Sequence, residues 1–192
     1  MKKPEELSEF IKSFKNVTFY QTMTWGGSIV KKGLRGIERR SFIDLSNING
    51  KSILDVGCAT GAEMLWAIEN GAISATGIDN QLKTDVVNDI AKFLNIPIKG
   101  IGFDLDNGLP EEIKNTKFDT AFLFSITHNI KYKNIWEDID ADVIYFETGA
   151  DSGMNEKKLS GKKYKATQIG ETPGSYASPR ICRKVFIMNR NK

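Results

Sequence analysis

Short apolar runs recur along the chain, and most are separated by stretches that have one apolar face at helical spacing. Apolar runs that alternate with amphipathic helices are typical of the buried strands of a parallel sheet. The pattern predicts such strands at Ser52–Val56, 73–78, 97–103, 118–126 and 142–146. Two further β segments are expected at 164–169 and 185–188. The chain is therefore predicted to be an α/β protein.

Helices are expected between these strands and before the first one. Apolar side chains at helical spacing predict them at 4–14, 34–45, 80–94 and 130–139. Another helix is expected to begin near Thr60, because Thr60 and Glu63 have the spacing of a capping box, and to end at Gly71. The aromatic and glycine-rich segment 19–27 has no clear period and predicts an ordered loop. That loop either packs against the domain or closes as a lid over a binding site.

The stretch from 52 to 80 carries the clearest candidate for a binding site. Gly57 and Gly61 frame a turn after the first strand, where a backbone without Cβ atoms can approach a ligand. Asp55 precedes this turn, and Asp79 ends the second strand. Because parallel strands bring their carboxyl ends to one edge of the sheet, both acids are expected to flank one crevice. A carboxylate at 79 suits the paired hydroxyls of a ribose.

The glycine spacing distinguishes between two classes of nucleotide ligand. A dinucleotide site needs Gly-x-Gly-x-x-Gly, so that the amino end of a helix meets a pyrophosphate. Residues 57–62 read Gly-Cys-Ala-Thr-Gly-Ala and lack two of these glycines in any register. A nicotinamide-dependent oxidoreductase is therefore disfavoured, and it is kept as an alternative.

Two motifs of this stretch resemble those of the class I S-adenosylmethionine-dependent methyltransferases. Leu-Asp-Val-Gly-Cys-Ala-Thr-Gly at 54–61 is similar to the first family motif, with Ala59 where glycine is usual, and Thr-Gly-Ile-Asp at 76–79 is similar to the second. The likeness extends from about 50 to 147. It implies a Rossmann-like three-layer sandwich with a seven-stranded, mostly parallel sheet and an antiparallel last strand. Residues 1–48 would form an amino-terminal helical or lid segment, and 49–192 the S-adenosylmethionine-binding domain, within one globular unit.

The resemblance also implies which residues hold the cofactor, S-adenosyl-L-methionine. Asp55 would lie near its amino-acid end, Gly57 and Gly61 would form the floor of the site, and Asp79 would bind the ribose hydroxyls. The complete implied set is Asp55, Gly57, Cys58, Ala59, Gly61, Asp79, Asn80, Asp104, Leu105 and Ser125.

The adenine end of the cofactor is assigned by the same resemblance. The third predicted strand ends in Asp104-Leu105-Asp106. In the family, an acid and the residue after it contact the adenine amino group and ring. Asp104 with Leu105 is the first choice for this pair, and Asp106 is the alternative acid.

Two residues are candidates for catalysis. Methyl transfer from a sulfonium is an in-line displacement, in which alignment of the nucleophile supplies much of the acceleration. His128, the only histidine of the chain, follows the fourth strand, where residues would face the reacting methyl group. It is a candidate general base for a hydroxyl acceptor, or else a histidine that only bonds a loop carbonyl. Glu147, at the end of the fifth strand, is the second candidate, against an ordinary paired carboxylate.

The sequence narrows the methyl acceptor in part. No Asp/Asn-Pro-Pro-Tyr/Phe motif follows the fourth strand, so exocyclic base amines are less expected. Val-Ile-Tyr-Phe-Glu147 with the later Arg180 and Arg183 weakly resembles the branch of wobble-uridine-modifying transfer-RNA methyltransferases and their small-molecule relatives. The expected acceptor is an oxygen or carboxylate of a small molecule, a sugar or an RNA nucleoside. The alternative to an enzyme is a cofactor-binding module that has lost catalysis and serves as a partner.

Basic residues form two clusters, which are either solvated faces or sites for phosphate. One cluster is Lys31, Lys32, Arg35, Arg39 and Arg40, and the other is Lys157, Lys158, Lys162, Lys163 and Lys165. The net charge of +3 is too mild to indicate nucleic-acid binding by itself.

The composition sets outer limits on the class of protein. A chain of 192 residues suits one domain. No apolar run approaches the roughly 18 residues of a membrane span, and the first residues lack the apolar part of a secretory signal, so a cytoplasmic protein without a membrane partner is expected. Cys58 and Cys182 are too few for a metal site or a disulfide framework, so no metal is expected.

Overall fold

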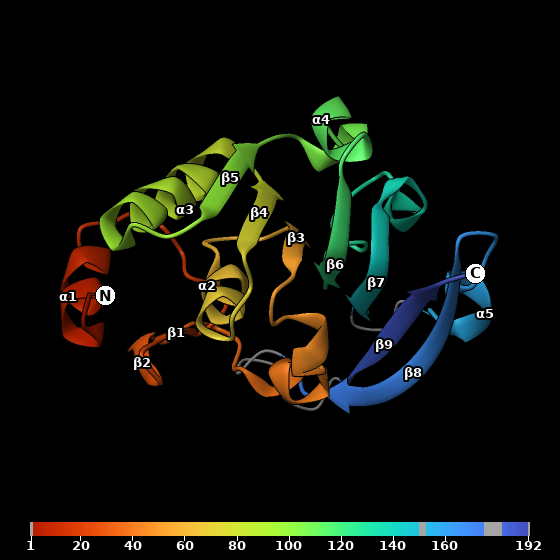
Figure 1. The fold of residues 1–192 in the computed structure, drawn as a ribbon, viewed down its shortest axis with the longest axis horizontal. Helices are drawn as coiled ribbons and strands as arrows, with labels where there is room; N and C mark the ends of the chain where they lie inside the picture. The colour runs from red at the N-terminus through yellow and green to blue at the C-terminus, as the bar shows by residue number, and fades with distance from the viewer. Residues whose placement is uncertain (1, 150–152, 175–181, 192) are drawn as a thin grey trace.

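The computed structural model describes residues 2–149, 153–174 and 182–191, and every structural statement below refers to these residues. Its centre is a seven-stranded sheet in the order β5-β4-β3-β6-β7-β9-β8 (Figure 1). The strands are β3 (Ser52–Val56), β4 (Ser74–Asp79), β5 (Ile98–Gly102), β6 (Lys117–Phe124), β7 (Asp140–Glu147), β8 (Tyr164–Thr172) and β9 (Arg183–Arg190). β3 to β7 run parallel, and β9 runs antiparallel to both β7 and β8. The predicted mostly parallel sheet with an antiparallel last strand is confirmed.

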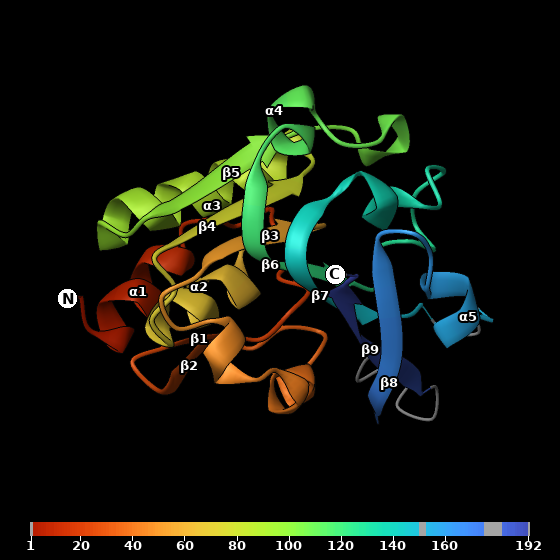
Figure 2. The ribbon, with the colours of Figure 1, turned by 45° about the vertical axis from the view of Figure 1, so that its right-hand side comes forward.

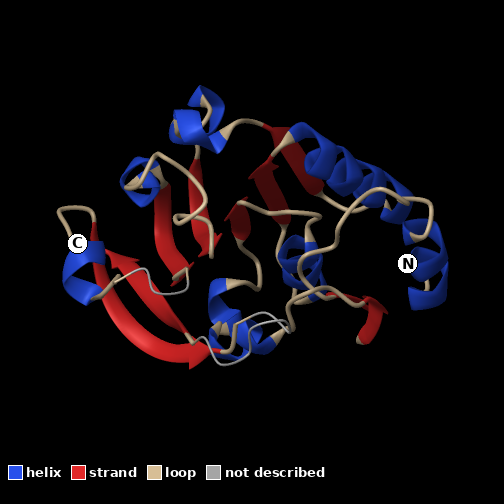
Figure 3. Cartoon of the chain, turned by 180° about the vertical axis from the view of Figure 1, so that it is seen from behind, coloured by secondary structure: helices blue, strands red, loops and turns tan. Residues whose placement is uncertain are grey.

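Helices lie on both faces of the sheet, which gives the predicted three layers (Figures 1 and 2). They are α1 (Pro4–Ile11), α2 (Ala62–Glu69), α3 (Gln81–Leu94), α4 (Glu111–Lys114) and α5 (Glu156–Leu159). α1 lies beside α3 at the β5 end of the molecule (Figures 1 and 3), where Phe10 stacks on Phe93 with ring centroids 4.2 Å apart. Within the described part of the chain, no helix is long and apolar enough to cross a lipid bilayer.

The core is divided between the two faces by the alternation of side chains along each strand. In β3, Ile53 packs with Phe122 on the face of α2, whereas Leu54 packs with Ile144 on the opposite face. All four side chains are fully buried. The sheet is therefore buried on both sides, which is why its strands read as continuous apolar runs in the sequence.

The segment 19–27 differs from its expected structure. It contains β1 (Met23–Trp25), which pairs with β2 (Ser28–Lys31) in an antiparallel hairpin, so the prediction of a loop is wrong. Gly26 and Gly27 have φ of +58° and +72°, the left-handed conformation that a tight hairpin turn requires at both positions. All three residues of β1 are buried. Met-Thr-Trp alternates apolar and polar residues, but three residues are too short a run for this alternation to indicate a strand.

Two predicted helices are also wrong. Residues 34–45 contain only two 3₁₀ helices, Glu38–Phe42 and Leu45–Asn47, and residues 130–139 contain only Ile135–Asp138. In the first segment the arginines are buried, so the alternation of charged and apolar residues does not separate a solvent face from a core face. The charged positions that indicated the solvent face of a helix are thus occupied by arginines that make contacts in the interior.

The turn between β3 and α2 is shaped by three residues with positive φ, namely Gly57 (+79°), Ala59 (+47°) and Gly61 (+80°). Gly61 is the N-cap of α2, so the expected capping box does not form, and the Thr60 hydroxyl has no hydrogen-bond partner within the described residues. A Cβ at Gly57 would lie 2.7 Å from the Ile126 side chain. Glycine is thus required at 57 for space and conformation, whereas Ala59 is held in a conformation that L-residues disfavour.

We expect Ala59→Gly to raise the free energy of unfolding by about 1 kcal/mol. The left-handed conformation costs an L-residue about 1 to 2 kcal/mol, and the greater freedom of glycine in the unfolded chain offsets part of this gain. Urea unfolding of the two proteins measures the difference. Ala67→Gly, in the regular part of α2, is the control and should lower the free energy of unfolding by about 1 kcal/mol or more. A loss of stability in both variants would contradict the strain at 59.

Candidate functional site

Two adjoining hollows open at the carboxyl edge of the sheet, and both are lined by Asp79, Lys83, Ile126 and Asn129. We call them together the Asp79 cavity. The larger hollow, of about 660 Å³, lies at the ends of β4 and β5. The smaller one, of about 210 Å³, lies between the turn after β3 and the end of β6, where the strand order reverses. Open α/β sheets bind their ligands at this kind of crevice.

Asp79 links the turn after β3 to the end of β4. Its Oδ2 accepts a hydrogen bond from the Ala59 N–H at 2.9 Å, and its Oδ1 accepts one from the Asn80 N–H at 2.8 Å. Lys83 Nζ lies 3.3 Å from Oδ1. The carboxylate lines both hollows, although the residue is only 9% exposed. The predicted proximity of the turn and this acid is therefore confirmed.

Most residues predicted to hold a cofactor line the Asp79 cavity. These residues are Gly57, Ala59, Asp79, Asn80, Asp104, Leu105 and Ser125. Asp106, the alternative to Asp104, lines it as well. Asp104 Oδ1 accepts a hydrogen bond from the Asp106 N–H at 3.0 Å and caps a short 3₁₀ helix, Leu105–Asn107. This cap fixes the backbone that follows β5.

Asp55, Cys58 and Gly61 belong to the predicted set but do not line the cavity. Asp55 and Cys58 are 3% and 2% exposed. Burial raises the pKa of the Asp55 carboxyl group well above its usual range, and the charge of Glu63 raises it further, whereas Arg39 opposes the shift. These residues belong to the turn or directly precede it, but they do not line the cavity. Direct contact between them and a cofactor stays a prediction.

Five charged side chains form an arginine–glutamate cluster next to the cavity. Arg35 donates two hydrogen bonds to Glu147, from Nη2 to Oε1 at 2.9 Å and from Nη1 to Oε2 at 3.2 Å. Arg40 Nε donates to Glu63 Oε2 at 2.7 Å. Arg39 lies between the two acids, 3.7 Å from Glu63 and 3.5 Å from Glu147. None of the five is more than 8% exposed, so the interpretation of these arginines as a solvated face or a phosphate site is wrong.

Glu147 is held by more partners than a proton acceptor would need. Burial raises the pKa of its carboxyl group, but Arg39, Arg35 and hydrogen bonds from Ser125 and Thr172 lower it by more, so its pKa lies below the usual 4.5. Ser125 Oγ donates to Oε2, and Thr172 Oγ1 donates to Oε1 at 2.5 Å. Ser125 has a φ of +57° and lines the Asp79 cavity. This arrangement favours a positioning role for Glu147, through Ser125, over proton transfer.

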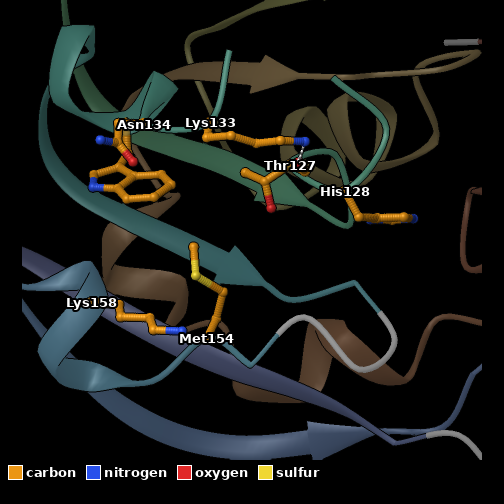
Figure 4. A pocket seen from close by; sticks show the side chains of 7 residues that line it. Thr127, His128, Lys133, Asn134, Met154 and Lys158 are labelled. Carbon is orange, nitrogen blue, oxygen red and sulfur yellow. Dashed lines mark hydrogen bonds between the residues drawn. The ribbon is translucent and has the colours of Figure 1, made fainter. Parts of the chain in front are cut away.

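A separate hollow, of about 420 Å³, lies at the end of β6 (Figure 4). We call it the Trp136 cavity. It is lined by Thr127, His128, Lys133, Asn134, Trp136, Met154 and Lys158. Lys158 comes from the second basic cluster, most of which is exposed. Arg180, named in the resemblance to transfer-RNA enzymes, lies outside the described residues.

His128 lies at the side of the Trp136 cavity opposite Asn134 (Figure 4). Its ring packs against the backbone of Gly149, where a Cβ would lie 2.5 Å away. Burial lowers the pKa of the imidazole below 6.5, and the charges of Arg183, Lys133 and Arg35 lower it further. The neutral imidazole that a general base requires is therefore the main form at neutral pH. No described group of His, Cys, Asp and Glu side chains is arranged to hold a metal ion.

Three amino-terminal residues line the Asp79 cavity, namely Thr18, Tyr20 and Gln21. The sequence did not single out any of them, although the lid alternative for 19–27 includes Tyr20 and Gln21. Their neighbours Phe19 and Met23 are buried in the core beside α1 to α3. The segment therefore packs on the domain with one side and lines the cavity with the other. Gln21 lines the cavity although Phe19 and Met23, two residues to either side, lie in the core, so no simple alternation marks the lining residues. Gln21 is 6% exposed, and its Oε1 has no hydrogen-bond partner in the described ranges.

Comparisons with known proteins give matches among solved structures. Neither a scan against protein-family models nor a search of the curated proteins finds a match. The bifunctional kinase-methyltransferase WbdD is 19% identical, with a TM-score of 0.69 over 95% of this chain and 46% of WbdD. The chain thus spans less than half the length of WbdD.

Two further structures match over different shares of their length. The amino-terminal domain of EvdMO1, crystallised in the presence of S-adenosylhomocysteine and D-fucose, is 14% identical, with a TM-score of 0.62 over 100% of this chain and 98% of that one. The 16S ribosomal RNA methylase RmtB is 14% identical, with a TM-score of 0.54 over 73% of this chain and 56% of RmtB. At such low identities the likeness concerns the fold. The chain shares the Rossmann-like α/β fold of these structures.

Proposed function

We propose that this protein is an S-adenosylmethionine-dependent methyltransferase that transfers a methyl group to an oxygen or carboxylate acceptor. The observation that carries the proposal is the hydrogen bond between the Ala59 N–H and Asp79, because it places a buried carboxylate and a glycine turn on one wall of a cavity. WbdD, EvdMO1 and RmtB support the proposal through their shared fold and through what their names and crystal contents say of them.

The chemistry of the cavity wall fits S-adenosylmethionine. Asp79 offers carboxylate oxygens to the ribose hydroxyls, and Asp104 with Leu105 offers an acid and an apolar side chain to the adenine. Gly57 leaves open the space beside Ile126 that a Cβ would fill. When bound, S-adenosylmethionine supplies a methyl carbon activated by its sulfonium. The acids at 79, 104 and 106 would favour a cationic ligand, and only Lys83 opposes them among the described lining residues of the larger hollow.

The residues of the chain then act by orientation and by exclusion of water. Tyr20 and Gln21 cover the smaller hollow from the amino-terminal side, and Ser125, fixed by Glu147, forms the opposite part of the wall. His128 is neutral at pH 7 and takes the proton of an acceptor hydroxyl. A carboxylate acceptor needs no base. We keep Glu147 as the second candidate base, although its ion pairs with Arg35 and Arg39 disfavour it.

We expect Asp79→Ala to weaken the binding of S-adenosylhomocysteine at least about 10-fold, because hydrogen bonds to a charged group contribute about 1.5 to 3 kcal/mol. Isothermal titration calorimetry measures this affinity without any acceptor. Asp89→Ala, which removes an exposed acid from α3, is the control and should bind as the unaltered protein does. An unchanged affinity in Asp79→Ala would remove Asp79 from the site. Binding of NAD in place of S-adenosylhomocysteine would overturn the proposed function.

We expect the imidazole of His128 to titrate below pH 6.5. Since it is the only histidine, its Cε1 proton gives a single signal that can be followed by NMR from pH 4 to 8. Lys133→Met should move this pKa upward, because one of the nearby positive charges is lost, whereas Lys131→Met is the control and should leave it in place. Methyl transfer to a hydroxyl should decline as the pH falls through the same value. A pKa above 6.5 in the unaltered protein would contradict the assigned surroundings of His128.

A further inference from the structure

The Trp136 cavity and the Asp79 cavity share one wall, formed by the residues that follow β6. Ile126 and Asn129 line the Asp79 cavity, and Thr127 and His128 line the Trp136 cavity. The two cavities therefore adjoin along residues 126–129, and an acceptor in the Trp136 cavity must extend past these residues to reach a methyl group in the Asp79 cavity. The Trp136 cavity also contains His128, the candidate general base.

The charge that lines the Trp136 cavity is positive. Lys133 comes from the loop after β6 and Lys158 from α5, on opposite walls (Figure 4). Lys133 Nζ donates to the carbonyl oxygens of Thr127, at 3.1 Å, and of Ile130. Lys158 Nζ donates to the carbonyl oxygen of Gly153 at 2.9 Å. Carbonyl oxygens are neutral, and no described carboxylate lines the cavity, although the charge of Lys133 also acts on Asp106 outside it.

A buried arginine, Arg183, adds a positive charge that acts on His128. Arg183, at the start of β9, is 8% exposed, and its Nε and Nη1 have no hydrogen-bond partner in the described part of the chain. Its charge and that of Arg35 both act on His128. Buried donors without a partner are costly unless an acceptor comes close to them. Arg183, Lys133 and Arg35 thus act together on His128, with Glu147 as the acid that opposes them.

The remaining lining suits a small organic molecule. Trp136 is 3% exposed and, with Met154, provides apolar surface, while Thr127 and Asn134 add hydrogen-bonding groups. A volume of about 420 Å³ is within the range of small-molecule sites, which is about 300 to 1,000 Å³. The size favours a small molecule over a folded RNA.

We propose that the Trp136 cavity binds the methyl acceptor and that this acceptor is a small organic anion, whose carboxylate or phosphate group lies between Lys133 and Lys158. The inference rests on the proposed function and adds the class of acceptor to it. Lys158 is the specificity-determining residue that is best suited to a test, because its side chain is exposed and its loss leaves no buried group without a partner.

The test uses calorimetry on the full chain saturated with S-adenosylhomocysteine. The probes are benzoate and phenyl phosphate, with benzyl alcohol as the neutral analogue of similar size. We expect at least one anion to bind at least about 10-fold more tightly than benzyl alcohol and to lose affinity as salt increases. A preference for benzoate assigns a carboxylate acceptor, and a preference for phenyl phosphate assigns a phosphate.

Matched variants separate a local charge effect from a general one. Lys158→Glu should weaken binding of the preferred anion about 10-fold or more, whereas Lys157→Glu changes the net charge equally on the same helix, outside the cavity lining, and should change it less than about 2-fold. Melting curves of both variants check their folding. Equal binding of anions and benzyl alcohol, or equal losses in the two variants, overturns the inference and leaves the proposed function intact. Failure of S-adenosylhomocysteine itself to bind overturns the proposed function and the acceptor role together.

Discussion

One residue, Arg35, connects the amino-terminal segment to the sheet edge. Its N–H donates to the Tyr20 carbonyl oxygen, and its own carbonyl oxygen accepts from the Thr22 N–H, both at 2.8 Å. Its guanidinium group bonds Glu147 at the end of β7, 112 residues further along the chain. These bonds together hold residues 20–22 against the end of β7. Separation of Arg35 from Glu147 would be costly, because it would leave an uncompensated charge in the interior. The part of the cavity wall that Tyr20 and Gln21 form is therefore fixed by electrostatics as well as by apolar packing.

The residues after β6 divide the carboxyl edge of the sheet into two regions of opposite charge. The Asp79 cavity is lined by three acids, Asp79, Asp104 and Asp106, and by one base, Lys83, whereas the charged residues that line the Trp136 cavity are Lys133 and Lys158, together with His128. In the function proposed above, a cationic sulfonium would belong to the first region and an anionic acceptor to the second. Such a division would orient both molecules toward the shared loop. Ser125, held in a left-handed conformation beside Glu147, is where this loop begins.

Local chemistry explains which elements were predictable. The strands of the sheet are buried on both faces and therefore appear as apolar runs, and the turn after β3 has positive φ at 57 and 61, a conformation that favours glycine. The helix predicted at 34–45 is wrong because arginine side chains are normally exposed to solvent, whereas those of this segment are buried. Burial of Arg35, Arg39 and Arg40 depends on Glu63 and Glu147, which belong to other elements of the fold.

The sequence by itself determined the strand, turn, helix and strand from 52 to 80, the parallel sheet and the approach of Asp79 to the turn, because these follow from local conformation and from the shared edge of parallel strands. Only the tertiary structure decided that Glu147 is an ion-paired anchor, that Gln21 lines the cavity and that Lys158 and Lys133 face one hollow. Each of these depends on contacts between residues distant in the chain. The free energy of a buried charge is set by such partners, and no pattern within a short stretch of sequence records them.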